Sequence, residues 1–100
     1  MSQKIEFTVQ AMKWFDKVNG NTYHSCRITR VSDSKALLCP FQYGYGEHYR
    51  QTALEALLKA KWIDCPESEL YAYERNNNYS IYWIVTDGLK RDVVALGLEN

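Results

Sequence analysis

Apolar and polar side chains alternate over the first residues of the chain, which predicts a β-strand with one buried face. From Lys4 to Ala11 every second residue is apolar, and the strand is expected to continue to Phe15. The bulky neighbours Trp14 and Phe15 interrupt the alternation, which indicates a bulge or a twist near the end of this strand.

A hairpin is expected next, because the pair Asn19-Gly20 tolerates the positive φ angles of a tight type I′ turn. A turn of two residues would place Phe15 opposite His24 and Ala11 opposite Ile28. Lys13 would then lie opposite Cys26, which fits poorly, so a bulge or a wider loop from about Asp16 to Thr22 stays open. On the second strand we expect the buried face to hold His24, Cys26 and Ile28, and the outward face to hold Tyr23, Ser25 and Arg27.

Alternation returns between Leu37 and Tyr45, after a polar connection at residues 31–35, and predicts a third antiparallel strand. Pro40 cannot donate a hydrogen bond to a neighbour, so this strand is expected at an edge of the sheet or with a bulge. From Glu47 the apolar period changes to that of a helix. Its expected buried stripe consists of Tyr49, Ala53, Ala56, Leu57 and Ala60.

The last third of the chain is expected to hold a short helix and a second hairpin. Residues 66–75 suit a short helix capped by Asp64, although residues 70–73 could also begin a strand. Residues 79–85 are aromatic or β-branched on both faces, which is typical of a central strand. The pair Asp87-Gly88 predicts a turn, followed by a final strand over residues 93–96.

These elements predict a single α+β domain over residues 1–100. Its sheet would be antiparallel, with about five strands in the order β-β-β-α-(α)-β-β, and one or two helices would cover it. A chain of this length can bury a core without the help of a metal or a disulfide.

Charge and cysteine content narrow the class of protein. The 12 basic and 12 acidic side chains balance, so no overall field gathers nucleic acid, although residues 1–46 hold six basic and three acidic groups. Cys26, Cys39 and Cys65 lie in or beside apolar runs, where a reduced thiol acts as a small hydrophobe. The N-terminus lacks the apolar core of a secretion signal, so we expect a cytoplasmic protein with no membrane association.

Two stretches are unusual, Trp-Phe-Asp-Lys-Val-Asn-Gly-Asn-Thr-Tyr-His-Ser at residues 14–25 and Phe-Gln-Tyr-Gly-Tyr-Gly-Glu-His-Tyr-Arg-Gln-Thr-Ala-Leu at residues 41–54. Together with Gly-Leu-Lys-Arg-Asp at residues 88–92, they resemble small uncharacterised accessory proteins of tailed bacteriophages and prophages. The resemblance covers most of the chain and implies an accessory protein that works in the cytoplasm of the host cell. Some phage proteins of this size bind and block host defence systems such as CRISPR effectors.

Catalytic and metal-binding patterns are weak in this chain. His24 and Cys26 would share one face of a strand, but a metal site needs three or four ligands and no second close pair is present. A Cys–His nucleophile pair needs a thiol within hydrogen-bond reach of the base, and three cysteines with two histidines give many chance pairings. We therefore expect no catalytic residue, no metal ligand and no cofactor.

The segment Gly44-Tyr45-Gly46 joins a strand to a helix, a layout in which backbone N–H groups can hold an anion. The same glycines are also explained by a turn at the end of the strand, which glycine permits. Glu47 in addition places negative charge at the start of the helix. The order of strands and helix also looks somewhat like a double-stranded RNA-binding domain. Where that family has basic residues at the helix start, this chain has Glu47, His48, Tyr49 and Arg50, which removes the phosphate-binding chemistry.

A protein-contact surface is the remaining candidate, because Tyr, Trp and Arg dominate the energetics of interfaces. The candidate residues are Trp14, Asn19, Asn21, Tyr23, Tyr43, Tyr45, Tyr49 and Arg50. The same rings could instead simply cover the sheet.

The leading hypothesis is a phage-type accessory protein that binds a host protein or protein complex and inhibits a host defence system. One alternative is a nucleic-acid-binding protein that uses the basic residues Lys13, Lys17, Arg27, Arg30 and Lys35. Another alternative is a small ligand-binding or hydrolytic protein. A homodimer, formed through an exposed face or an edge strand, is a further possibility.

Overall fold

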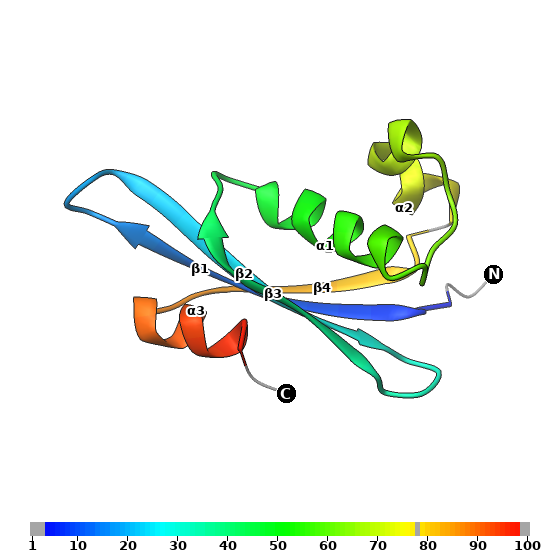
Figure 1. Cartoon of the computed structure of the whole chain (residues 1–100), viewed down its shortest axis with the longest axis horizontal. Coiled ribbons are helices and arrows are strands. Elements are labelled where there is room, and N and C mark those ends of the chain that lie inside the picture. Colours follow the sequence, from blue (N-terminus) through cyan, green and yellow to red (C-terminus); the bar gives the residue numbers. More distant parts are fainter. Residues whose placement is uncertain (1–3, 78, 99–100) are drawn as a thin grey trace.

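A mixed four-stranded sheet with helices on both faces forms the framework of the protein (Figure 1). The computed structural model describes residues 4–77 and 79–98. Strands β1 (Phe7–Asp16), β2 (Asn21–Arg30) and β3 (Ala36–Tyr43) form an antiparallel meander, and β4 (Ile81–Asp87) pairs with β1 in parallel. The strand order is β3-β2-β1-β4. The predicted α+β class is confirmed.

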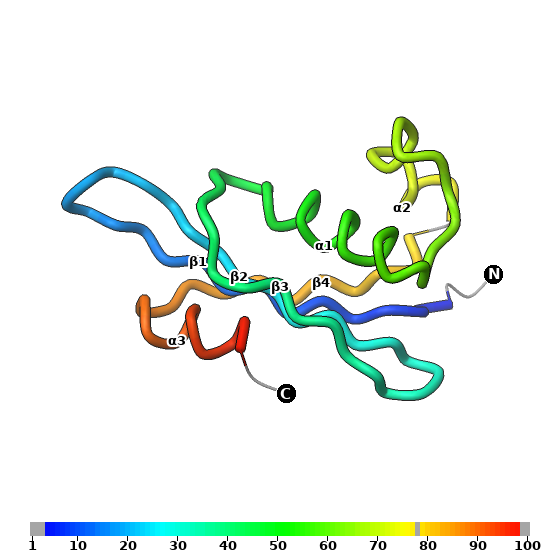
Figure 2. Tube along the Cα trace, in the orientation of Figure 1, coloured from blue at the N-terminus to red at the C-terminus, as the bar shows by residue number. Residues whose placement is uncertain are grey.

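The helices lie on opposite faces of the sheet (Figure 1). Helix α1 (His48–Lys59) covers one face, and the 3₁₀ helix η1 (Glu67–Ala72) and α2 (Tyr73–Asn76) continue the chain toward β4. Because β3 and β4 are the two edge strands, this segment carries the chain from one edge of the sheet to the other (Figure 2). Helix α3 (Lys90–Leu96) packs on the opposite face against β1, β2 and β3.

The main core lies between α1 and the sheet. The sheet contributes the alternating residues that the pattern predicted, and α1 contributes the apolar stripe. The buried members are Phe7, Val9, Ala11, Cys26, Ile28, Cys39, Tyr49, Ala53, Leu54 and Leu57. The predicted helix over residues 47–60 is therefore confirmed, together with the face that it buries.

The predicted two-residue hairpin turn was wrong, and the wider loop is the observed one. Asp16 pairs with Asn21 and Ala11 pairs with Cys26, so four residues lie in the connection. The Asp16 carboxylate accepts hydrogen bonds from the backbone N–H groups of Val18, at 3.0 Å, and Asn19, at 3.3 Å. These bonds stabilise the longer loop, and only Gly20, with φ of 68°, needs a left-handed conformation.

The face of β2 predicted to point outward is covered by α3. Ser25 is fully buried, and its hydroxyl donates a hydrogen bond to the carbonyl of Val93 at 2.5 Å. Val93 and Leu96 are the buried residues of this helix. The expectation of an outward-facing Ser25 was therefore wrong, because a second helical layer lies over this strand.

The predicted C-terminal hairpin was also wrong, since residues 90–96 form α3 rather than a strand. Gly88 lies tightly against Met12, where an added Cβ would be 2.6 Å from the methionine sulfur, and its N–H donates to the carbonyl of Lys13. The chain therefore leaves the sheet at Gly88. The β-branched pair Val93-Val94 suggested a strand, but Val93 and Leu96 are three residues apart and share one helical face.

Within the residues that the structure describes, the sheet therefore has four strands of mixed direction rather than about five antiparallel strands. Strand β4 lies at an edge, so the prediction of a central strand was wrong. Its apolar residues Tyr82, Ile84 and Val85 are exposed. A run that is apolar on both faces suggested burial on both sides, but here it lies at an open edge.

The expectations for Pro40 and for residues 66–75 are confirmed. Strand β3 is the other edge, and its pairing with β2 shifts register between His24 and Cys26, opposite Pro40. Residues 67–76 are helical as η1 and α2, although Pro66, and not Asp64, is the N-cap.

Cys26, Cys39 and Cys65 are free thiols. Cys26 lies opposite Cys39 in the β2–β3 pair, and their shared hydrogen bond together with burial raises the pKa of Cys26. Over residues 4–77 and 79–98, no helix is both long and apolar enough to cross a membrane.

Candidate protein-interaction surface

Five aromatic rings from three strands and the loop after β3 pack against one another on the α3 side of the sheet. We call this set the aromatic cluster, and its members are Trp14, Tyr23, Phe41, Tyr43 and Tyr45. Tyr23 is central: its ring centroid lies 5.7 Å from Trp14, 4.9 Å from Phe41 and 5.8 Å from Tyr43. Tyr43 in turn makes an edge contact with Tyr45 at 5.3 Å.

The outer part of the aromatic cluster faces solvent and is held in place. Tyr43 and Tyr45 are 51% and 56% exposed. The Tyr45 hydroxyl donates to the carbonyl of Gly20 at 3.2 Å, which joins the end of β3 to the first hairpin. A hydrogen bond with Tyr45 raises the pKa of Tyr43. On the inner side, Lys90 lies over the Trp14 ring with its Nζ 5.6 Å from the centroid.

The hairpin between β1 and β2 carries a polar rim beside this cluster. The Asn19 side chain donates to Asp16 at 2.8 Å, which is the main reason that the pKa of Asp16 is lowered. Asn21 begins β2 and is half-buried, whereas Asn19 is exposed. Both asparagines flank Gly20, whose carbonyl accepts the Tyr45 hydroxyl, and Asn19 stabilises the loop.

The glycines after β3 are explained by close packing and by backbone conformation. An added Cβ at Gly44 would lie 2.7 Å from both His24 and His48, and Gly46 has φ of 54°. The N–H of Gly44 donates to Thr22, and that of His48 donates to Tyr45. Two of the N–H groups that an anion would need are therefore already engaged.

His24 lies under this loop and is 1% exposed. Its Nε2 is 2.8 Å from the Thr52 hydroxyl, and among the described residues its Nδ1 has no hydrogen-bond partner. Burial, assisted by the neighbouring His48, lowers the pKa of His24. His24 is therefore a buried residue of β2 that packs against the first turns of α1.

Tyr49 and Arg50 were predicted to belong to the same surface, but they lie on the other face of the sheet. Tyr49 is buried and makes an edge contact with Trp83 at 5.7 Å. Arg50 is 3.2 Å from Glu74 and 3.7 Å from Glu47, and its guanidinium lies over the Trp83 ring. These two residues hold α1, α2 and β4 together.

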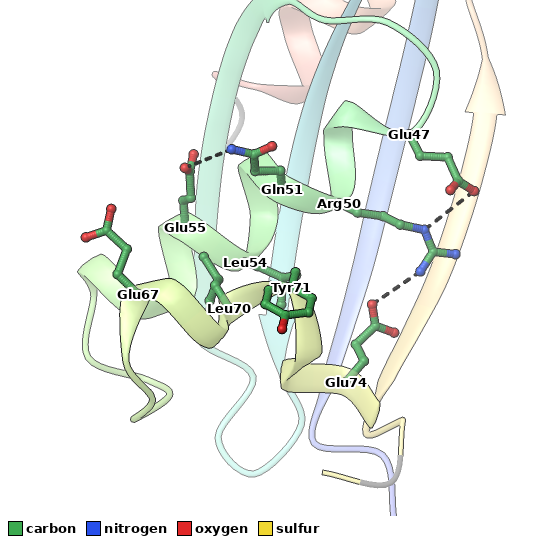
Figure 3. A pocket seen from close by; sticks show the side chains of 9 residues that line it. All are labelled: Glu47, Arg50, Gln51, Leu54, Glu55, Glu67, Leu70, Tyr71 and Glu74. Atoms are coloured by element: carbon green, nitrogen blue, oxygen red, sulfur yellow. Dashed lines mark hydrogen bonds and ion pairs between the residues drawn. The ribbon is translucent and has the colours of Figure 1, made fainter. Parts of the chain in front are cut away.

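A groove of about 590 Å³ lies beside Arg50, between α1 and the helical segment η1–α2 (Figure 3). In the figure Arg50 lies between Glu47 and Glu74, and Gln51 is bonded to Glu55. The acidic lining residues outnumber the single arginine, and most of the polar groups are engaged with one another. The groove thus combines an acidic lining with the apolar side chains of Leu54, Leu70 and Tyr71.

The basic residues proposed for nucleic acid do not form one surface. Lys17 lies in the β1–β2 hairpin and Lys35 at the opposite end of the sheet, beside the β2–β3 connection. Arg30 binds Asp33 at 2.6 Å, and Lys13 lies over the Tyr49 ring on the α1 face. Arg27 lies on β2 between Cys26 and Ile28, the residues that face α1, and therefore points to the α3 side. No continuous basic stripe links these five side chains.

Sequence reasoning missed Phe41 as a member of the surface. Strict alternation placed Phe41 on the same face as Cys39, but the bulge at Pro40 turns Phe41 onto the Tyr23 ring. The proline itself was the available signal, since it predicted a bulge at this position. Within the described ranges, no group of three His, Cys, Asp or Glu side chains could hold a metal ion.

Comparisons of the chain with protein families, with curated proteins and with solved structures found no match.

Proposed function

We propose that this chain is a non-enzymatic accessory protein that binds a host protein through the aromatic cluster and inhibits a host defence system. The observation that carries the proposal is the stacked arrangement of Trp14, Tyr23 and Phe41 behind the exposed Tyr43 and Tyr45. Rings held against one another lose little conformational entropy when a partner covers them, so their burial contributes directly to affinity.

The chemistry of the surface favours a protein partner. Tyr43 and Tyr45 present both an apolar ring and a hydroxyl group, and polar residues of the β1–β2 hairpin lie beside them. Such a combination of aromatic centre and polar border is typical of protein interfaces. The resemblance of residues 14–25 and 41–54 to phage and prophage proteins supports a host protein as the partner, and a defence complex is the class to test first.

The proposal is tested by pull-down from host lysate with the wild-type chain and with a double variant, Tyr43→Ala with Tyr45→Ala. We expect the wild type to retain a specific host protein and the double variant to bind it at least about 30-fold more weakly. Tyr71→Ala is the matched control, because Tyr71 is 82% exposed and lies outside the aromatic cluster. In parallel, the wild type is expected to relieve a defence phenotype in host cells.

Two results would contradict the proposal. One is the absence of both a partner and any change of defence phenotype. The other is a partner that binds the double variant as tightly as the wild type. A gel-shift titration in low salt separates the nucleic-acid alternative, because a protein that works by phosphate contacts should bind DNA or RNA at about micromolar concentration under those conditions.

A further inference from the structure

We propose that a second copy of this chain pairs with strand β4, so that two sheets join edge to edge across a two-fold axis. This surface is separate from the aromatic cluster, whose outer tyrosines lie at the end of β3, at the opposite edge of the sheet. The inference therefore does not depend on the proposed function.

The two edges of the sheet differ in how they are protected. Edge strands of monomeric proteins usually carry a proline, a lysine, a bulge or a covering segment that prevents pairing with another chain. Strand β3 has Pro40, a shift of register, and Gly97 packed against its backbone, where an added Cβ would be 2.8 Å from the Cα of Pro40. Strand β4 consists of Ile81–Asp87, and its sequence contains no proline, lysine or glycine.

The side chains of β4 form an exposed apolar strip. Tyr82 and Ile84 are 57% and 44% exposed on the α3 side, beside Thr8 and Gln10 of β1. Val85 is 37% exposed on the α1 side. Figure 3 shows β4 as the outermost strand, next to β1. Both faces of this edge therefore offer apolar surface that a partner strand would cover.

The strip is complementary to itself when two copies run antiparallel. With Ile84 on the two-fold axis, Ile84 faces Ile84 of the second copy, Trp83 faces Val85, and Tyr82 faces Thr86. Each of these three pairs thus joins β-branched or aromatic residues, the pairs that stabilise sheets most. All seven residues of β4 find a partner in this register.

Charges also favour a second copy in this orientation. Asp87 is the only charged residue of β4, and in the antiparallel pair it lies opposite Ile81 of the second copy. Ile81 shares a surface hollow with Arg50, Glu74 and Arg75. Because Glu74 already pairs with Arg50, Arg75 is the cation that each Asp87 of the second copy approaches. The two Asp87 carboxylates stay apart by about 20 Å, the length of six strand steps.

The oligomeric state of the full chain tests the proposal, measured by native mass spectrometry and by light scattering after size exclusion at about 100 μM. The wild type is expected to be a dimer. Ile84→Lys would set two ammonium groups opposite each other and weaken the dimer at least about tenfold. Tyr82→Lys serves as a second variant if Ile84→Lys does not fold, as judged by circular dichroism.

Two controls make the test specific. Val18→Lys adds a lysine at a side chain that is 92% exposed in the first hairpin, and it should dimerise like the wild type. Asp87→Arg should weaken the dimer and Arg75→Asp should do the same, whereas the double variant should restore it. Restoration is expected only if these two side chains meet across the interface.

A wild-type monomer at this concentration would overturn the proposal and leave the edge open to an extended segment of another protein. The proposed pairing would also be overturned if folded Ile84→Lys formed a dimer as tightly as the wild type. The same holds if the double variant of Asp87→Arg and Arg75→Asp did not restore the dimer. The variant with Tyr43→Ala and Tyr45→Ala should dimerise normally, so failure of either proposal is distinguishable from failure of the other.

Discussion

The two faces of the sheet carry very different covers. On one face α1 buries aliphatic side chains completely, and Val9, Ile28 and Leu57 are each 0% exposed. On the other face α3 has only seven residues, buries Val93 and Leu96, and leaves the aromatic cluster half exposed beside it. The difference indicates that the α1 face supplies most of the stability, while the α3 face holds rings in place for contact.

The largest expected effect comes from the α1 face. Leu57→Ala would remove a fully buried side chain and lower the free energy of unfolding by about 2–5 kcal/mol, because both transfer energy and a cavity are lost. Val93→Ala, on the α3 face, should cost about 2 kcal/mol, since fewer methyl groups are lost. Urea denaturation measures the free energy of unfolding of both variants. A larger loss for Val93→Ala than for Leu57→Ala would show that the α3 face, and not the α1 face, supplies more of the stability.

The attachment of α3 can be tested at Gly97. A Cβ at this position would meet the backbone of Cys39 and Pro40, which cannot yield as a flexible side chain can. Gly97→Ala is therefore expected to lower the free energy of unfolding by about 1–3 kcal/mol. It should also change the near-ultraviolet circular dichroism of the adjacent aromatic cluster. Leu98→Ala is the control, because Leu98 is 67% exposed and its loss should change stability by less than about 0.5 kcal/mol.

The α1 face should also make stability depend on pH through His24. Burial lowers the pKa of His24 below its ordinary value of 6.5, so the unfolded chain binds a proton more readily than the folded chain. Stability is then complete above about pH 6.5 and falls as the pH drops below it, by at most about 1.4 kcal/mol per pH unit.

Denaturation at several pH values checks this dependence. His24→Gln should remove the slope, whereas most of it should persist in His48→Gln, because burial is the larger cause of the shift. A stability that is flat between pH 7 and about pH 5 would show that the folded protein accepts the proton without penalty.

The smallest effect on stability is expected at the outer rings of the aromatic cluster. Tyr43→Ala and Tyr45→Ala should leave the denaturation midpoint nearly unchanged, because more than half of each side chain is already exposed. Phe41→Ala should shift it more, since Phe41 stacks on Tyr23 at 4.9 Å. A large loss of stability from the outer tyrosines would instead assign them to the core of the fold.

Local patterns in the sequence determined much of the framework. Alternation of period two located β1 and its buried face, the change to helical period at Glu47 located α1, and Pro40 predicted the bulged edge. The tyrosines of the aromatic cluster were also identified from composition around the turns. These features depend on residues that are close together in the sequence, so the sequence alone is enough to predict them.

Only the tertiary structure decided the parts that depend on packing between distant segments. Residues 90–96 form a helix because Gly88 fits against Met12 and Val93 packs over Ser25, contacts that no local pattern contains. The apolar run of β4 became an edge because, within the described residues, β1 is its only strand neighbour. The sequence thus determined which residues can form strands and helices, whereas the order of the strands decided which of their side chains meet solvent.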